Sequence, residues 1–445
     1  VSDILGSGLS GSQAYYTATG GPGGAGTMIT DGTVYSAPTT ITIYAYDENG
    51  ACASEQWFTV TVNSLPTITG NAPICVGATV QLSGTGTPDG TTPWSSSNTG
   101  VATVSTTGLV SGDAGGTSDI TYLDANGCQN IVTVTVNANP TITGNAPICV
   151  GTTVQLSGTG TPDGITPWSS SNTGVATVSI TGLVNGVAGG TSDITYLDAN
   201  GCQNVVTVTV NANPVISGNA PICVGGTLAL SGSGVPDGTT PWTSSNTGVA
   251  TIDNAGLITS VSAGTTDITY LDNTGCQVIE TVIVNGIPTI TGDAPICVGS
   301  DVQLTGAGTP DGITPWVSAN IAVATIDNAG LVTGIDIGTS TITYLDVNGC
   351  QNTIIVTVNG IPTLTGNAPI CVSSTLQLTG SGTPDGITPW ASSNTGVASI
   401  DNSGLVTGVT GGTSTITYLD INGCQQTVIV TVNDLPVISG NMTVC

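Results

Sequence analysis

The chain has 445 residues, with no Lys, Arg or His, and its 27 acidic residues, 24 of them Asp, give a formal net charge of −27. Binding to nucleic acid and docking on an anionic membrane surface are excluded, because both need Lys or Arg to neutralise phosphate. A Ser/His/Asp or Cys/His catalytic arrangement cannot form without His. No apolar run approaches the ~18 residues of a membrane helix, so we expect no direct membrane insertion.

Residues 1–63 form a divergent first unit, whose end, "FTVTVN", matches the later parts of the chain. The sequence begins without Met and stops inside a motif, at Cys445. We therefore expect a window of a longer protein, whose remaining chain is the first partner of this segment.

Cysteines mark repeats along the rest of the chain. From Cys75 onward the gaps between cysteines alternate between 53 and 21 residues, which gives a period of 74. This period exceeds those of helical solenoids, so each copy is predicted to be a small domain. The five complete copies are residues 64–137, 138–211, 212–285, 286–359 and 360–433, and residues 434–445 begin a sixth. The first two copies differ at only eight positions.

Within residues 138–211 every signal is that of a strand or a turn. Val and Thr favour strands, and Asn200-Gly201 is a strong hairpin dipeptide between the last two. The predicted strands are residues 140–144, 152–159, 167–172, 175–179, 183–187, 192–198 and 203–211. Seven short strands at this spacing predict an all-β chain, a tandem array of immunoglobulin-like antiparallel β-sandwich domains.

Each copy has one Trp in the third predicted strand and one Tyr in the sixth. A functional interpretation would make them platforms that stack on sugars. We favour core positions, because a sandwich commonly buries one Trp and one Tyr and each copy has little else that is large. The predicted core residues are Trp94, Trp168, Trp242, Trp316 and Trp390, with Tyr122, Tyr196, Tyr270, Tyr344 and Tyr418.

The motifs "ICVGTTVQLSG", "PWSSSNTGVATVS", "GLVTGV" and "GTSTITYLD" resemble the bacterial Ig-like group 2 repeat over residues 64–433. The added "IC" and "NGCQ" resemble the variant found in giant surface proteins of the Bacteroidota, including gliding-motility adhesins exported by type IX secretion. Residues 1–63 resemble another Ig-like unit found beside such repeats. The resemblance implies an extracellular location at the cell surface, associated with the outer membrane, and a role as stalk. It carries over no catalytic residue.

Two cysteines per copy in a secreted protein indicate disulfides. In a sandwich of this type Cys149 precedes the second strand, near the lower pole, and Cys202 lies in a hairpin at the upper pole. A seven-residue strand separates the poles by roughly 23 Å, whereas a disulfide needs Cα atoms within about 7 Å. We therefore predict bonds that cross the domain junctions, namely Cys75–Cys202, Cys149–Cys276, Cys223–Cys350 and Cys297–Cys424.

The alternatives are free thiols and a pairing within each copy, in which an unusual first strand brings the two cysteines together. The pairing within copies would be Cys75–Cys128, Cys149–Cys202, Cys223–Cys276, Cys297–Cys350 and Cys371–Cys424. Under the cross-junction scheme, the cysteines left to find partners near or beyond the ends of the chain are Cys52, Cys128, Cys371 and Cys445.

The linkers "NANP" and "NGIP" contain Pro and almost no flexible length. Each domain should span ~40 Å from strand rise and loops. Together with bonds across the junctions, this predicts an extended, stiff rod on the order of 200 Å or more.

Two aspartates recur in each copy, one in the "PDG" turn and one before the hairpin cysteine. Both turns are predicted at the upper pole, and Asp-x-Asn-Gly also occurs in calcium loops. The alternative interpretation is a plain turn, in which Asp accepts its own backbone N–H groups. The calcium candidates are Asp163, Asp198, Asp237, Asp272, Asp311 and Asp346, and no other cofactor is expected.

Three functions fit these features. The first is a structural stalk of a cell-surface adhesin, with near-identical copies setting its length. The second is a repeated module that binds glycans or other surface proteins through avidity. The third is a spacer array in a secreted polysaccharide-degrading enzyme. The segment itself is not expected to be an enzyme, because its aspartates recur identically in turn motifs.

Overall fold

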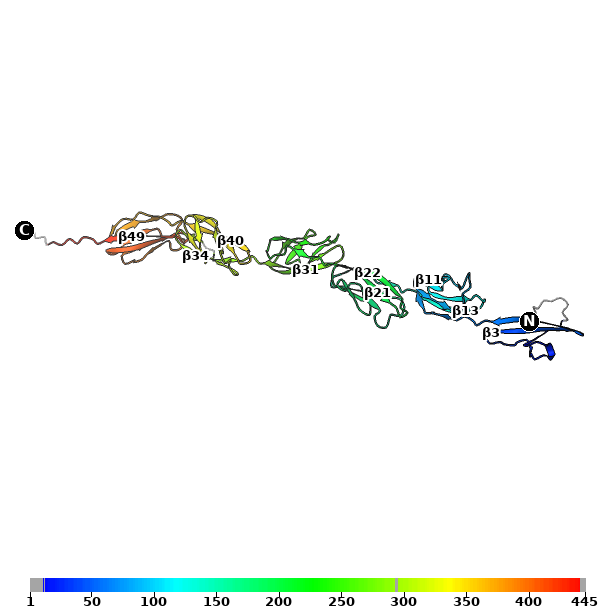
Figure 1. Ribbon diagram of the computed structural model, residues 1–445. Coiled ribbons are helices and arrows are strands. Elements are labelled where there is room, and N and C mark those ends of the chain that lie inside the picture. The colour runs from blue at the N-terminus through cyan, green and yellow to red at the C-terminus, as the bar shows by residue number, and fades with distance from the viewer. Residues whose placement is uncertain (1–10, 12, 293–294, 441–445) are drawn as a thin grey trace, which may run out of the picture. The chain divides into compact units, whose positions relative to one another are not determined.

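The computed structural model describes residue 11 and residues 13–292 and 295–440. Its regular elements in that range are β-strands and one 3-10 turn, η1 (Gly21–Gly23), shown in Figure 1. Over the same residues, no helix is long and apolar enough to cross a membrane. The chain divides into two compact units, residues 1–213 and 214–445, which are described separately.

The first unit begins with one antiparallel sheet of four strands in the order β2-β1-β3-β4. These strands are β1 (Ala14–Tyr16), β2 (Met28–Ile29), β3 (Thr39–Asn49) and β4 (Cys52–Val62). β3 and β4 form a hairpin of eleven paired positions, from Thr39↔Val62 to Asn49↔Cys52. The Ig-like sandwich expected for residues 1–63 stays a prediction, because their described part forms this sheet alone.

The second complete copy, residues 138–211, has nine strands. They are β14 (Ile142–Thr143), β15 (Ile148–Cys149), β16 (Thr153–Gln155), β17 (Ser157–Gly158), β18 (Trp168–Ser170), β19 (Ala176–Val178), β20 (Leu183–Gly186), β21 (Gly190–Leu197) and β22 (Gln203–Asn211). One sheet has the order β15-β22-β21-β18, a second β16-β20-β19, and a two-stranded ribbon joins β14 to β17. This is the repeated Ig-like sandwich that the strand spacing predicts.

The first two predicted strands differ from the structure. Residues 140–144 contribute only β14, and the chain then crosses to the four-stranded sheet as β15. β15 pairs in parallel with β22, through Ile148↔Val210 and Cys149↔Asn211, so the sandwich is not wholly antiparallel. The predicted strand 152–159 is divided into β16 and β17, which join different sheets.

The first copy repeats this pattern within the same unit. Its strands are β5 (Ile68–Thr69), β6 (Ile74–Cys75), β7 (Thr79–Gln81), β8 (Ser83–Gly84), β9 (Trp94–Ser96), β10 (Ala102–Val104), β11 (Leu109–Gly112), β12 (Gly116–Leu123) and β13 (Gln129–Asn137).

The second unit holds the third, fourth and fifth copies. The third has β23 (Ile216–Ser217), β24 (Ile222–Cys223), β25 (Thr227–Ala229), β26 (Ser231–Gly232), β27 (Trp242–Ser244), β28 (Ala250–Ile252), β29 (Leu257–Ser260), β30 (Gly264–Leu271) and β31 (Gln277–Asn285). The fourth has β32 (Ile290–Thr291), β33 (Ile296–Cys297), β34 (Asp301–Gln303), β35 (Thr305–Gly306), β36 (Trp316–Ser318), β37 (Ala324–Ile326), β38 (Leu331–Gly334), β39 (Gly338–Leu345) and β40 (Gln351–Asn359). The fifth has β41 (Leu364–Thr365), β42 (Ile370–Cys371), β43 (Thr375–Gln377), β44 (Thr379–Gly380), β45 (Trp390–Ser392), β46 (Ala398–Ile400), β47 (Leu405–Gly408), β48 (Gly412–Leu419) and β49 (Gln425–Asn433).

Each copy has its own apolar core between the two main sheets. In the second copy Val184, Ile194 and Val208 are fully buried, as their alternation with polar residues along the strands predicts. Trp168 on β18 lies opposite Tyr196 on β21, with ring centroids 4.6 Å apart. All ten of the Trp and Tyr residues expected in the core are buried, and the five ring pairs have centroid distances of 4.5–4.7 Å.

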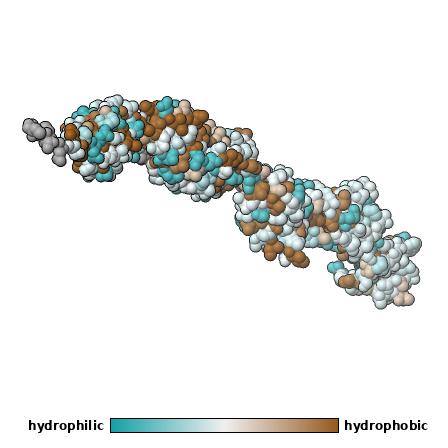
Figure 2. Space-filling model, turned by 90° about the vertical axis from the view of Figure 1, so that its left-hand side faces the viewer, coloured by the Kyte–Doolittle hydropathy of each residue, from teal (hydrophilic) through white to brown (hydrophobic). Residues whose placement is uncertain are grey.

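Other apolar side chains remain on the surface and mix with polar ones (Figure 2). The most exposed of them in the five complete copies lie in the "PDG" turns, where Ile165, Ile313 and Ile387 are at least 80% exposed. Thr occupies the equivalent position in the first and third copies, so this exposure is not a property of every repeat.

Candidate functional site: the disulfide junctions

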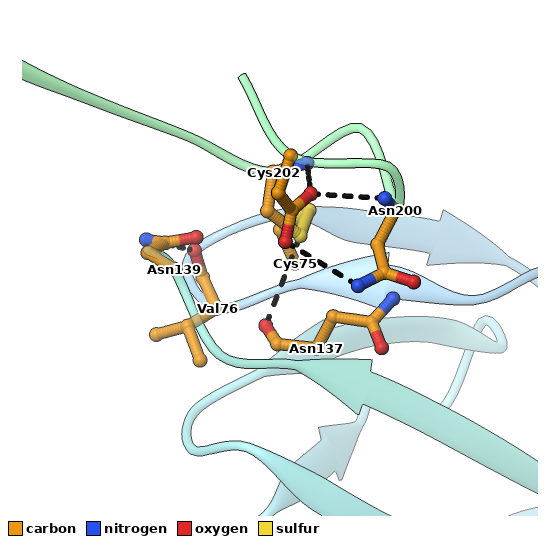
Figure 3. Close-up of a disulfide and its surroundings, with 7 residues drawn as sticks. Cys75, Val76, Asn137, Asn139, Asn200 and Cys202 are labelled. Carbon is orange, nitrogen blue, oxygen red and sulfur yellow. Dashed lines mark hydrogen bonds between the residues drawn. A yellow bond between two sulfur atoms is a disulfide. The ribbon is translucent and has the colours of Figure 1, made fainter. Parts of the chain in front are cut away.

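The cysteines of consecutive copies meet where one domain ends and the next begins. Cys75 closes β6 and pairs with Asn137, the last residue of β13, so it lies beside the start of the linker. Cys202 lies in the turn between β21 and β22 of the following copy. The two form a disulfide with their Cα atoms 5.5 Å apart (Figure 3).

The second unit contains two equivalent bonds, Cys223–Cys350 and Cys297–Cys424, each with Cα atoms 5.6 Å apart. All three bonds join cysteines 127 residues apart, so each links one copy to the next. Cys149 and Cys276 are also disulfide-bonded. The structure thus contains bonds of the cross-junction type, and the specific pair Cys149–Cys276 stays a prediction.

None of the pairings within a copy is formed. Cys149 lies beside Asn211 at the end of β22, whereas Cys202 directly precedes that strand. The nine-residue strand places the two cysteines about 27 Å apart, far beyond the reach of a disulfide. The first strand does change sheets, but its second part, β15, lies beside the end of β22, which keeps Cys149 at the lower pole. The pairs that the structure rules out are Cys75–Cys128, Cys149–Cys202, Cys223–Cys276, Cys297–Cys350 and Cys371–Cys424.

Four cysteines were expected to find partners near or beyond the ends of the chain, and three of them are free thiols in the structure. Cys52 and Cys371 are exposed and Cys128 is partly exposed. The fourth, Cys445, lies outside the described residues.

The hairpin turn holds its cysteine through a buried carboxylate. Asp198 is only 5% exposed, and its Oδ1 accepts hydrogen bonds from the backbone N–H groups of Asn200 (3.0 Å) and Cys202 (2.8 Å). The Asn200 side chain donates to Asp198 Oδ2 at 3.3 Å. Because it accepts these N–H groups, the carboxylate fixes the backbone on which the disulfide depends. Burial of the Tyr196 side chain, and secondly the charge of Asp198, raise the pKa of Tyr196.

The same bond to the cysteine N–H recurs in every copy, at 2.7–2.9 Å. It is accepted by Asp124, Asp198, Asp272, Asp346 and Asp420.

The second turn that recurs in each copy, "PDG", lies directly beside the hairpin turn. In the second copy Pro162 forms a β-bridge with Asp198, and Asp163 N–H donates to the Leu197 carbonyl at 3.1 Å. The Asp163 carboxylate accepts the N–H groups of Ile165 and Thr166 at 3.0 and 2.8 Å. These bonds lower the pKa of Asp163.

The calcium candidates are therefore brought together in pairs, as expected, but their carboxylates already accept N–H groups of their own turns. Asp163, Asp237 and Asp311 lie in "PDG" turns and Asp198, Asp272 and Asp346 in hairpin turns. Within the described residues, no group of three or more Cys, Asp or Glu side chains could hold a metal ion.

Asparagine side chains fasten the linker on both sides. In the first junction Asn139 Nδ2 donates to the Val76 carbonyl of the preceding copy at 3.1 Å. Asn204, on β22 of the following copy, donates through Nδ2 to the carbonyl of Pro140 at 2.8 Å. Figure 3 shows Asn137 and Asn139 next to the Cys75–Cys202 bond. The linker is therefore held by a disulfide and by hydrogen bonds to two domains.

These asparagines were not among the residues predicted to matter at the junctions. The sequence did contain a sign of their role, because Asn is unfavourable inside a strand. Asn nevertheless stands second in the final strand of three copies, at Asn130, Asn204 and Asn352. Each of the three donates to the carbonyl of its linker proline at 2.8 Å.

The model of the bacterial Ig-like domain (group 2) family matches five stretches of the chain, residues 60–136, 133–210, 219–282, 289–358 and 363–432. The chain belongs to this family. Each match coincides with one of the sandwiches described above. Bacterial Ig-like group 2 domains therefore account for both the fold and the repeat.

Two curated relatives contain similar sequence. Ice-binding protein 1 of Shewanella frigidimarina is 32% identical over 403 residues, which are 78% of this chain and 45% of that protein. A 3-O-alpha-D-galactosyl-alpha-L-arabinofuranosidase of Bifidobacterium longum is 41% identical over 92 residues, 19% of this chain and 8% of the enzyme. The chain spans less than half the length of either relative.

Among solved structures, the eight N-terminal Ig domains of Down Syndrome Cell Adhesion Molecule match 95% of this chain and 68% of that one. The sequence identity is 12% and the TM-score is 0.23.

Proposed function

We propose that this chain is a stalk segment of a large secreted adhesin, which holds binding domains away from the outer membrane of the cell. The observation that carries the proposal is the repeated joint. Three disulfides of identical spacing each tie one Ig-like domain to the next. A joint of this kind gives neighbouring domains two covalent attachments, which suits a spacer that must keep its ends apart.

The relatives support a carrier role. Similar sequence occurs in a protein named for ice binding and in a glycosidase, and in both most of the length lies outside the match. Repeats that accompany such different activities are best explained as structural parts of longer proteins. The wider setting, a Bacteroidota gliding-motility adhesin exported by type IX secretion, rests on the sequence resemblance and is part of the proposal.

The location proposed is extracellular. Disulfides persist in oxidising compartments, and the described part of this chain carries them at successive junctions. The expected partners are the rest of the same chain and, through domains elsewhere in it, surface glycans or other surface proteins.

The repeated binding module is the second candidate, and the enzyme spacer the third. Stacking on sugars would need exposed aromatic rings, and the repeats bury the Trp and Tyr of each core. The exposed Trp57 (67%) lies in residues 1–63, outside the five copies, so it does not recur. This distribution favours the stalk over binding by avidity.

A deletion within the parent protein tests the proposal. Removing residues 138–285 takes out two whole copies and keeps the cysteine spacing, so that the first copy joins the fourth through an equivalent junction. We expect ligand binding by the purified protein to be unchanged, and the distance that it reaches from the cell surface to fall by about 80 Å.

The control is removal of residues 138–248, which takes out the second copy and only the first half of the third, so that the remaining residues 249–285 cannot form a sandwich. Loss of binding in solution after the in-phase deletion would overturn the proposal in favour of the binding module.

A further inference from the structure

We infer that the disulfides carry tension past the domain cores, so that the chain between Cys75 and Cys350 cannot lengthen when its domains unfold. This property follows from the covalent connections alone and does not depend on what the parent protein displays. It would make the array a tether of fixed maximum length.

The shortest covalent route through the chain is far shorter than the chain itself. The bonds Cys75–Cys202 and Cys223–Cys350 are separated by only 21 residues, from Cys202 to Cys223. Tension applied on both sides therefore passes through two disulfides and this short segment. The remaining residues between Cys75 and Cys350 form side branches of the route.

The segment 202–223 is short, and much of it is extended already. In the first unit it begins as β22, a strand that runs the length of its sandwich from Gln203 to Asn211. In the second unit it continues as β23 and β24 and ends at Cys223. A strand rises about 3.3 Å per residue, close to the limit of about 3.6 Å for any chain. Unfolding these strands therefore adds only a few ångströms, and the whole segment cannot exceed about 80 Å.

The fourth copy shows where the tension would run inside one domain. β40 begins directly after Cys350, which is bonded to Cys223 of the third copy. β33 ends at Cys297, which is bonded to Cys424 of the fifth copy. The two strands lie side by side and parallel, with Ile296↔Val358 and Cys297↔Asn359 in register. Both tension-carrying strands therefore share one edge of the four-stranded sheet.

Beyond Cys350 the route passes through the core of that copy. Residues 298–349 connect Cys297 to Cys350 and are the shortest covalent link between the bonds Cys223–Cys350 and Cys297–Cys424. Unfolding of this copy therefore releases only the 53 residues between its two cysteines, about 180 Å of chain. A copy without such bonds would release its 74 residues, which is about 250 Å of chain.

Pulling single molecules of the full chain from its two ends, below forces that break covalent bonds, tests the inference. Under oxidising conditions the shortest route comprises about 170 residues, so the extension should stop near roughly 600 Å. In reductant all 445 residues contribute, and the limit should rise about 2.6-fold, to roughly 1,550 Å. An oxidised chain that extends as far as the reduced one would overturn the inference.

Two variants sharpen the result. Replacing the free thiols, as Cys52→Ser, Cys128→Ser and Cys371→Ser, should leave the oxidised limit unchanged, because these residues form no bond on the route. Replacing all twelve cysteines by Ser should give the longer limit without reductant. If that variant fails to fold, the comparison of one wild-type molecule before and after reduction still decides the question. Failure here would leave the in-phase deletion test of the stalk unaffected.

Discussion

At the scale of single residues, the core of each copy depends on a glycine that no turn requires. The Tyr196 ring lies so close to the backbone of Gly158 that a β-carbon at that position would overlap it. The ring also packs at 4.6 Å on Trp168, a contact that contributes about 0.5–1.5 kcal/mol beyond area burial. Gly158 therefore makes room for the aromatic pair.

Placing Ala at this position in all five copies should destabilise the domains. Inserting a methyl group into a packed core costs about 1–3 kcal/mol per site, so thermal unfolding of the full chain should move to lower temperature. The substitutions are Gly84→Ala, Gly158→Ala, Gly232→Ala, Gly306→Ala and Gly380→Ala.

The chain offers a matched control in the "PDG" glycines, where a β-carbon would meet open space. These are Gly90, Gly164, Gly238, Gly312 and Gly386. Ala at these five positions should leave the melting temperature unchanged or slightly higher. Equal melting curves for the two five-site variants would contradict the packing argument.

At the scale of elements, the turns are held by charge-assisted hydrogen bonds. The Asp237 carboxylate accepts N–H from Thr240 and Thr239 and a hydroxyl bond from Thr239. The Thr240 N–H first, and the Thr239 hydroxyl next, lower the pKa of Asp237 from 3.8 to about 2. Because the folded state lowers this pKa, the stabilisation is complete above about pH 4 and is lost as the pH falls towards about 2.

The prediction is a pH-dependent difference between the native chain and the Asp237→Asn variant. The native chain should melt at the higher temperature at pH 6, and the gap should close between about pH 4 and about pH 2. Acidification also reduces the repulsion among the other carboxylates, but it does so in both proteins, so this effect cancels in the difference between their melting temperatures. A gap that stays constant down to pH 2 would show that the carboxylate charge does not stabilise the turn.

The sequence predicted the elements that have a repeated local signal. Alternating Val and Thr marked β22, Asn200-Gly201 marked its hairpin, and the cysteine spacing located both poles of the sandwich. The change of sheet between β14 and β15 could not be predicted, because each strand is two residues long and has no alternation. The parallel pairing of β15 with β22 is a contact between the two ends of a copy, and no local pattern encodes it.

At the scale of the whole molecule, the arrangement of disulfides is the feature most open to chemical test. We expect digestion without reductant, by a protease that does not need Lys or Arg, to yield linked peptides for Cys75–Cys202, Cys223–Cys350 and Cys297–Cys424, identified by mass spectrometry. Cys149 should be linked to Cys276. Each bond closes a long loop and should contribute about 5 kcal/mol in the chain-entropy account.

The same digest after reduction is the control, and each linked pair should then separate. A peptide joining Cys149 to Cys202 would contradict the structure, since Cys202 is bonded to Cys75.

The two bonds of the fourth copy also bear on damage. A protease that cut once within residues 298–349 would separate the backbone into two pieces. The piece ending at the cut would still be attached at Cys297 to Cys424, and the piece starting there would still be attached at Cys350 to Cys223. A chain nicked in this way would stay in one piece in an oxidising environment, and one domain would lose its fold without the two ends of the chain separating.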